Sequence, residues 1–183
     1  PIHSVVASFL LENKVGYIKV IRFSATTAIE FESSMKDLAQ QGATSVIVDI
    51  RGNGGGYLRS ATDMIDRFLD EGLGIVYTEG KASPRIDYTS SYNGEYSSWP
   101  IAVLIDESSA SASEIFAGAL QDNDRGLIVG RRSFGKGLVQ EEFSVPNAIS
   151  GAGALRLTVA RFYTPSGRAI QKPYGEGVDY NHD

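Results

Sequence analysis

A serine-rich turn holds the best candidate nucleophile in the sequence. Residues 101–106 are apolar except for Asp106 and predict a buried strand, and residues 111–121 predict a helix directly after the turn. Small side chains surround Ser111, which would let a substrate carbonyl approach closely. The start of a helix also offers unpaired N–H groups where negative charge develops during acyl transfer. Because Ser111 and Glu114 equally match the S-x-x-E capping box, the segment favours either a nucleophile or an ordinary helix cap.

A lysine between two glycines is the best candidate for a base. Gly135 and Gly137 flank Lys136 and would let the backbone bring its amine close to another group. A lysine acts as a base near neutral pH only when burial or a neighbouring cation lowers the pKa of its amine by about 3 units. Phe134 and Leu138 could supply an apolar wall for this purpose. The ordinary alternative is an exposed loop lysine.

The same segment nearly matches the phosphate-binding loop G-x-x-x-x-G-K-[ST]. However, Gly137 stands where a serine or threonine would hold Mg²⁺. The residues that follow, 138–143, predict a strand, whereas this motif opens a helix. A nucleotide site is therefore disfavoured.

A glycine run is the third segment that could contribute chemistry. Gly54, Gly55 and Gly56 follow a predicted buried strand over 44–50 and precede a predicted helix over 57–70. They form either an ordinary tight turn or a loop whose backbone N–H groups bind an oxyanion.

Composition excludes several other chemistries. The 183 residues carry a net charge of −5 and no block of Lys and Arg, so a nucleic-acid partner is not expected. The absence of cysteine excludes a Cys nucleophile, a thiolate metal site and disulfides. His3 and His182 lie at opposite ends of the chain, which disfavours a Ser–His–Asp triad and a multi-His metal site. No apolar run has the length of a membrane span, and no signal peptide is present, although a chain that starts at Pro1 is expected to be a processed product or a fragment.

The elements that must position these residues alternate between strands and helices. The remaining predicted elements are a helix over 26–41 and strands over 4–11, 17–23, 74–78, 126–130, 138–145 and 154–163. The polar stretch 79–99 predicts a hairpin that turns at Asn93–Gly94. The helix over 26–41 should bury an apolar stripe made of Ala28, Ile29, Phe31, Met35, Leu38 and Ala39. This alternation indicates an α/β protein with a largely parallel sheet.

Four segments together resemble the carboxyl-terminal processing, or tail-specific, proteases. They are VDIRGNGGG at 48–56, SASASEI at 109–115, FGKGLVQ at 134–140 and YTPSGR at 163–168. One such motif is weak, but all four occur in the same order, and the resemblance covers most of residues 16–171. It implies that Ser111 is the nucleophile of a Ser–Lys dyad, that Lys136 is the general base and that Gln140 orients the lysine.

The resemblance also assigns the oxyanion hole. The backbone N–H of Ala112 would supply one donor and the glycine loop the other, with Gly55 preferred and Gly56 as the alternative. Asp122 matches an acidic position of some relatives, but a helix-end or surface carboxylate is an equally good interpretation of it.

The implied fold is a ClpP/crotonase-like α/β core, with a largely parallel sheet flanked by helices and additional β-strands. Residues 1–183 would form one protease core domain without the PDZ domain that commonly precedes it, and 172–183 a loose tail. The implied activity is endoproteolysis of unfolded or C-terminal polypeptide segments through an acyl-enzyme, without metal or other cofactor. Family members act outside the cytoplasm, in the periplasm or cell envelope, and the family leaves room for a homo-oligomer and for an adaptor or membrane-associated substrate.

A second class of function stays open, namely a non-catalytic module that binds peptides or hydrophobic ligands on the same fold. The intact Ser111, Lys136, Gln140 and glycine loop favour the enzyme. Because proteases of this kind are often gated, a dyad whose two side chains are apart is compatible with either class.

Overall fold

A five-stranded sheet forms the centre of the protein in the computed structural model, which describes residues 2–148 and 151–173. Its strands lie in the order β1 (Val5–Leu10), β2 (Val15–Val20), β3 (Ser45–Asp49), β6 (Ile101–Ile105) and β7 (Leu127–Gly130). A short 3-10 turn, η1 (Glu12–Lys14), joins the antiparallel pair β1 and β2, and all other neighbours are parallel. The predicted α/β class with a largely parallel sheet is confirmed.

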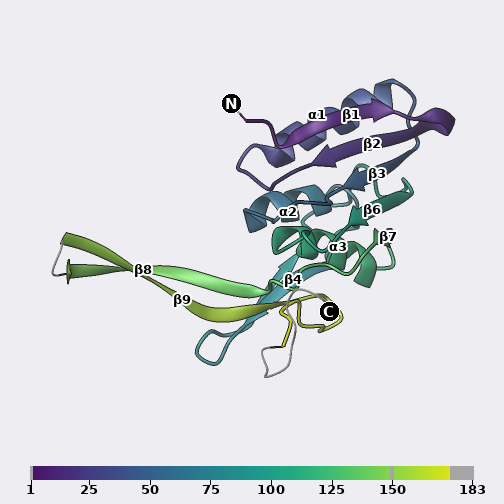
Figure 1. Ribbon diagram of the computed structural model, residues 1–183. Coiled ribbons are helices and arrows are strands. Elements are labelled where there is room, and N and C mark those ends of the chain that lie inside the picture. The colour runs from purple at the N-terminus through teal and green to yellow at the C-terminus, as the bar shows by residue number, and fades with distance from the viewer. Residues whose placement is uncertain (1, 149–150, 174–183) are drawn as a thin grey trace.

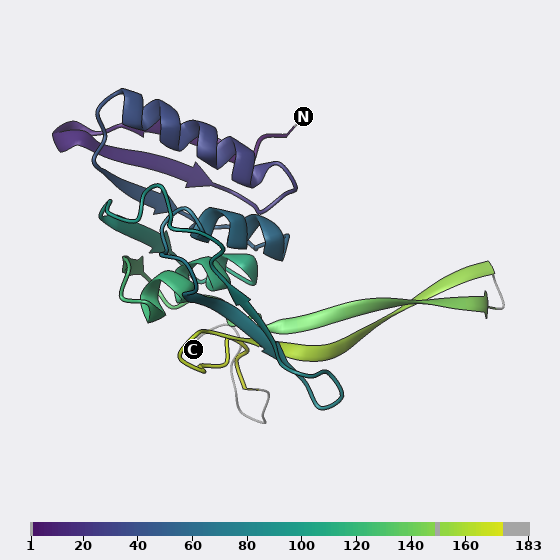
Figure 2. The same cartoon turned by 180° about the vertical axis from the view of Figure 1, so that it is seen from behind.

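Three helices cover one face of this sheet (Figure 1, Figure 2). They are α1 (Thr27–Gln40), α2 (Leu58–Ile65) and α3 (Ala112–Asp122), and they pack side by side, α1 against α2 and α2 against α3. Strand residues that face the helices, such as Ile18, Val48 and Val103, are fully buried. The helices share one face because each parallel crossover has the same hand and the strands are added in one direction.

A second, antiparallel sheet supplies the additional strands. Its order is β5 (Ile86–Thr89), β4 (Gly74–Glu79), β9 (Gly151–Tyr163) and β8 (Leu138–Ala148). Strand β9 pairs with β4 only over residues 161–163, so the rest of β8 and β9 projects from the body as a long two-stranded ribbon (Figure 1). Strand β8 begins two residues after Lys136 and therefore ties the loop of the candidate base to this sheet.

Two sequence predictions about packing are wrong. Helix α1 buries Phe31, Met35 and Leu38, which follow one another at helical spacing, whereas Ile29 is 71% exposed. Ile29 lies two residues before Phe31 and so points to another side of the helix. Ala39, in the last turn of the helix, is also exposed.

The predicted hairpin does not turn at Asn93–Gly94. Strand β5 pairs with β4, and the turn between them lies at residues 80–85. Asn93 instead accepts a hydrogen bond from the Glu71 N–H at 3.0 Å. A Cβ on Gly94 would lie 2.5 Å from the Arg67 carbonyl oxygen, so this dipeptide docks its loop onto the body. Helix α2 also ends at Ile65, before the predicted residue 70.

Candidate active site

The serine turn joins the end of β6 to the start of α3 and packs against the glycine loop. The Ser109 hydroxyl donates to the Ile50 carbonyl at 2.9 Å, and the Ser113 hydroxyl donates to the Asn53 carbonyl at 2.8 Å. Both serines are buried. Ser111 is partly exposed, and its O–H donates to no acceptor within the described residues. The three alternating serines therefore have two different tasks, and only Ser111 is available to a substrate.

The backbone of Ser111 is strained. Its φ is 57° and its ψ is −115°, a combination that residues with a Cβ rarely adopt. Such strain costs about 1–3 kcal/mol and persists only where the surrounding structure imposes it. A serine held on a sharp, strained turn between a strand and a helix is the arrangement by which many serine hydrolases present their nucleophile.

Asn53 connects the glycine loop to the serine turn. Its side-chain amide donates to the Val20 carbonyl at 3.0 Å, and its side-chain oxygen accepts the Gly55 N–H at 2.9 Å. The Ala110 N–H donates to the Asn53 carbonyl at 3.1 Å. Asn53 is fully buried, so these bonds fix the loop against both the end of β2 and the serine turn.

The glycines of this loop are required by close approach as well as by backbone conformation. Gly55 has a φ of +95°, and a Cβ there would lie 2.5 Å from the Ala110 carbonyl oxygen and 2.9 Å from the Ala112 nitrogen. Gly56 has a φ of +146°, and a Cβ there would overlap the Phe23 carbonyl oxygen. No side chain fits at either position, and the Gly55 backbone lies directly beside the Ser111 turn.

The backbone donors next to Ser111 differ in availability. The Gly55 N–H is already bonded to Asn53. The N–H groups of Gly56 and Ala112 donate to no acceptor in residues 2–148 and 151–173. Ala112 is the first residue of α3, where the orphan amides of a helix favour negative charge.

An ion network around the buried Asp49 lies at the start of the glycine loop. Asp49 accepts hydrogen bonds from the Tyr17 hydroxyl at 2.7 Å, the Lys19 amine at 3.0 Å and the Arg51 guanidinium at 2.7 Å. Burial alone would raise the pKa of Asp49, but the bonds from Arg51, Tyr17 and Lys19 hold it well below the usual range of a carboxyl. This network fixes the point at which the chain leaves β3.

The lysine loop, residues 131–137, runs from β7 to β8 and passes beside the serine turn. The Phe134 N–H donates to the Ser109 carbonyl at 3.0 Å. The Gly137 N–H donates to the Gln171 side chain at 3.0 Å, and the Lys172 N–H donates to the Gly135 carbonyl at 3.0 Å. The main chain of this loop is thus held from two sides.

The side chain of Lys136 is not held. It is exposed, and its amine makes no hydrogen bond or ion pair with any described residue. The apolar wall expected from Phe134 is absent, because that ring is 52% exposed. Ser111 and Lys136 lie on neighbouring segments, but no hydrogen bond joins their side chains. Gln140 lies in β8 opposite Thr158, is exposed, and is likewise not bonded to Lys136.

One carboxylate that the sequence assigned only to a helix cap joins the two segments. The capping box of Ser111 and Glu114 is present, and Glu114 Oε2 accepts the Ser111 N–H at 2.9 Å. The same oxygen accepts the Lys136 N–H at 2.8 Å. Glu114 Oε1 accepts the Gly135 N–H at 2.6 Å and the Ser133 hydroxyl at 2.8 Å. No sequence signal points to these additional bonds, because their donors lie 19–22 residues further along the chain.

Asp122 lies at the end of α3 and stabilises a distant turn. It accepts the Ser166 N–H at 3.0 Å and the Ser166 hydroxyl at 2.5 Å, and it pairs with Arg168. Burial would raise the pKa of Asp122, but the hydrogen bonds from Ser166, Thr164 and Arg168 lower it below its ordinary value. These contacts favour a structural role for Asp122, as a carboxylate at the end of a helix, over a role beside Ser111.

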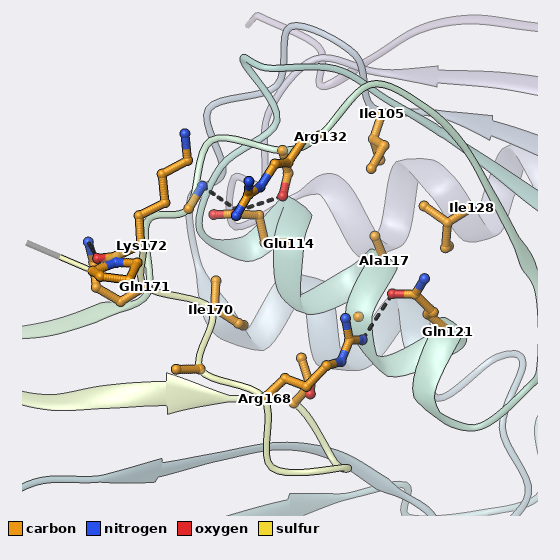
Figure 3. A pocket seen from close by; sticks show the side chains of 16 residues that line it. Ile105, Glu114, Ala117, Gln121, Ile128, Arg132, Arg168, Ile170, Gln171 and Lys172 are labelled. Atoms are coloured by element: carbon orange, nitrogen blue, oxygen red, sulfur yellow. Dashed lines mark hydrogen bonds between the residues drawn. The ribbon is translucent and has the colours of Figure 1, made fainter. Parts of the chain in front are cut away.

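A cavity of about 300 Å³ lies beside the lysine loop, between α3 and residues 164–173 (Figure 3). Glu114, Arg132, Gln121 and Arg168 are among its polar lining residues, and neither Ser111 nor Lys136 lines it. Over the described ranges, no group of three or more His, Cys, Asp or Glu side chains could hold a metal ion. None of the helices described is both long and apolar enough to cross a membrane. Residues 174–183, most of the predicted tail, lie outside the described residues.

An α/β core that presents a strained serine at a strand-to-helix turn, with a glycine loop packed against it, is typical of serine hydrolases. Comparison with known proteins defines the family. The sequence model of peptidase family S41 matches residues 14–182, and the chain belongs to that family.

Relatives agree with this membership. The chain is 41% identical over 159 residues, 87% of its length, to a carboxyl-terminal-processing protease of Picosynechococcus sp., and 40% identical over 168 residues, 89% of its length, to a carboxy-terminal-processing protease of Bartonella bacilliformis. It spans 37% and 38% of the length of these two relatives. A solved photosystem II D1 C-terminal processing protease matches with a TM-score of 0.78 and 34% identity, over 92% of this chain and 43% of that one.

Proposed function

We propose that this chain is the catalytic core of a serine endopeptidase that cleaves peptide bonds through a Ser111–Lys136 dyad. The observation that carries the proposal is the strained backbone of Ser111. Its O–H donates to no described acceptor, whereas the hydroxyls of both neighbouring serines donate to carbonyls at the glycine loop. Strain of this kind is retained where function requires it. Membership of a peptidase family supports the same conclusion.

The reaction begins when the neutral amine of Lys136 takes the proton of the Ser111 hydroxyl. The Ser111 oxygen then attacks the peptide carbonyl carbon and forms a tetrahedral intermediate. When this intermediate collapses, the C–N bond breaks and the leaving amine takes the proton from Lys136. Water then attacks the acyl-enzyme, again with Lys136 as base, and releases the acid and free Ser111.

The oxyanion of the intermediate needs two donors. Ala112 supplies one, since its amide is free at the start of α3. For the second we assign Gly56 rather than Gly55, because the Gly55 amide is already bonded to Asn53.

Before turnover, the Lys136 side chain must rotate toward Ser111. Its four-carbon stem allows this movement, and its amine has no protein partner to leave among the described residues. Gln140 would then orient the amine. This open state is also what favours the second candidate function, a module that binds peptides or hydrophobic ligands without cleaving them.

The substrate class follows from the relatives, which are named for carboxyl-terminal processing. We infer that this chain acts on unfolded or C-terminal polypeptide segments outside the cytoplasm, in the periplasm or cell envelope. Extended peptides commonly bind by adding a strand to a sheet edge, and β8, which starts beside Lys136, is such an edge. A homo-oligomer and an adaptor or membrane-associated substrate belong to the same proposal.

The test is incubation with an unfolded polypeptide and analysis of the products by mass spectrometry. The parent chain should cleave it, and Ser111→Ala and Lys136→Ala should not. Cleavage that survives Ser111→Ala would refute the assignment of the nucleophile. Binding of the polypeptide without any cleavage by the parent chain would favour the non-catalytic module.

A further inference from the structure

The Glu114 carboxylate accepts main-chain N–H groups from both the serine turn and the lysine loop. It projects from the first turn of α3 toward the lysine loop near Arg132 (Figure 3) and is only 7% exposed. Its oxygen Oε2 accepts the main-chain N–H groups of both Ser111 and Lys136. A single atom therefore sets how close the backbones of these two residues lie.

Glu114 accepts more hydrogen bonds than a helix cap requires. A cap needs only the bond to the Ser111 N–H, whereas Gly135, Lys136 and Ser133 supply three further donors. An ionised carboxylate can accept all four bonds, because it has about four acceptor positions and no donor. A glutamine in its place would turn an NH₂ group toward some of these N–H groups. An aspartate is one methylene shorter, which would weaken its reach to the lysine loop.

Other contacts hold the lysine loop at other points. Glu107 of the serine turn pairs with Arg131, but this ion pair is exposed and lies five residues before Lys136. The bonds from Gly137 to Gln171 and from Lys172 to Gly135 hold the far side of the lysine loop. The Phe134 N–H reaches the Ser109 carbonyl, but it lies two residues before the lysine. Because the Lys136 amine has no hydrogen bond among the described residues, its reach to Ser111 depends on where its backbone is held.

We propose that Glu114 is a positioning residue, which holds the main chain of Lys136 at the distance from Ser111 that proton transfer requires. The inference rests on the proposed dyad for its catalytic consequence, but its structural part stands on the four bonds alone. Without Glu114, Lys136 keeps its amine and Ser111 its hydroxyl, but the two lose their common anchor. A misplacement of about 1 Å in an active site can cost about a hundredfold in rate.

The test compares Glu114→Gln with Ser133→Ala in the full chain. Ser133→Ala is the matched control, because it removes one of the four bonds and leaves the three main-chain donors in place. Two readouts are needed, namely kcat and KM for peptide cleavage, and hydrogen exchange at the Gly135 and Lys136 amides. Glu114→Gln should lower kcat by roughly ten- to hundredfold with little change in KM, and both amides should lose protection. The control should stay within about threefold of the parent in kcat and should keep the protection, because it loses only one part-buried hydroxyl bond.

The outcomes separate this inference from the proposed function. Protection of both amides that persists in Glu114→Gln overturns the positioning role whatever the cleavage assay gives, and so does lost protection with unchanged kcat. A merely stabilising role would lower the melting temperature and leave kcat per folded molecule unchanged. If Glu114→Gln does not fold, Glu114→Asp keeps the charge at the start of α3 and should show the same loss. If the parent chain itself cleaves nothing, the dyad fails, and hydrogen exchange alone supports or overturns the anchor.

Discussion

A methyl group at Gly55 should separate the glycine loop from the serine turn. In Gly55→Ala the new Cβ would lie 2.5 Å from the Ala110 carbonyl oxygen, 2.8 Å from the Ser111 Cβ and 2.9 Å from the Ala112 nitrogen. The positive φ of +95° costs an L-residue about 1–2 kcal/mol, and relief of the overlap costs about 1–3 kcal/mol more. The free energy of unfolding should therefore fall by roughly 2–5 kcal/mol. Because the displaced atoms carry Ser111 and the Ala112 amide, kcat should fall by about a hundredfold.

The same loop provides a matched control. Gly52 has a φ of +73°, but nothing lies within 4 Å of the Cβ that an alanine would place there. Gly52→Ala should thus lose about 1–2 kcal/mol of stability through backbone strain alone and keep its kcat. Urea unfolding gives the two stabilities, and peptide cleavage normalised to folded protein gives the two rates. Equal losses of stability and equal cleavage rates in the two variants would refute the argument that close approach at Gly55 positions Ser111.

Two further predictions concern the strain at Ser111 and the network at Asp49. Ser111→Gly and Ser111→Ala should both abolish cleavage. Ser111→Gly should be more stable than Ser111→Ala by about 1 kcal/mol, because glycine accepts the φ of 57° without penalty. Equal melting temperatures of the two variants would show that the turn is not strained. Asp49→Asn should lower the free energy of unfolding by about 1–3 kcal/mol at pH 7, because it removes the buried carboxylate to which the partly exposed Lys19 and Arg51 donate. Since the pKa of folded Asp49 lies below its unfolded value of about 4, this stabilisation is complete above about pH 5 and is lost as the pH falls further. Urea unfolding between pH 7 and pH 2 should show the difference between the two proteins shrinking below about pH 5, and a constant difference would contradict the role of the Asp49 charge.

Local patterns were sufficient to predict most elements of the fold. Buried strands of parallel sheets are continuous apolar runs, and residues 44–50 and 101–106 show this pattern and form β3 and β6. Helix α3 was predicted within one residue, because a capping box marks its start. The turn at Asn93–Gly94 was wrong, because a dipeptide with good hairpin chemistry can equally serve to dock a loop, and only tertiary contacts decide between the two.

The residues of the candidate site could be predicted from the sequence, but the hydrogen bonds that join them could not. The serines and glycines are adjacent in sequence, so their motifs could be recognised. The different roles of Ser109, Ser111 and Ser113 depend on which of their hydroxyls donate hydrogen bonds to carbonyls at the glycine loop. Those carbonyls lie about 60 residues earlier in the chain. The role of Glu114 has the same origin, since its partners beyond the helix cap come from a different loop. The occupied Gly55 amide could not be foreseen either, because it depends on the rotamer of Asn53.

The central claim is that Ser111 is a nucleophile activated by Lys136, and covalent labelling tests it most directly. The chain is treated with a fluorophosphonate that reacts with activated serines, and the labelled peptide is identified by mass spectrometry. We expect the label on Ser111 alone, and a labelling rate at least tenfold lower in Lys136→Ala, because a general base contributes about 10²–10⁴-fold to such reactions. Labelling of Ser109 or Ser113, or an equal rate in Lys136→Ala, would contradict the account.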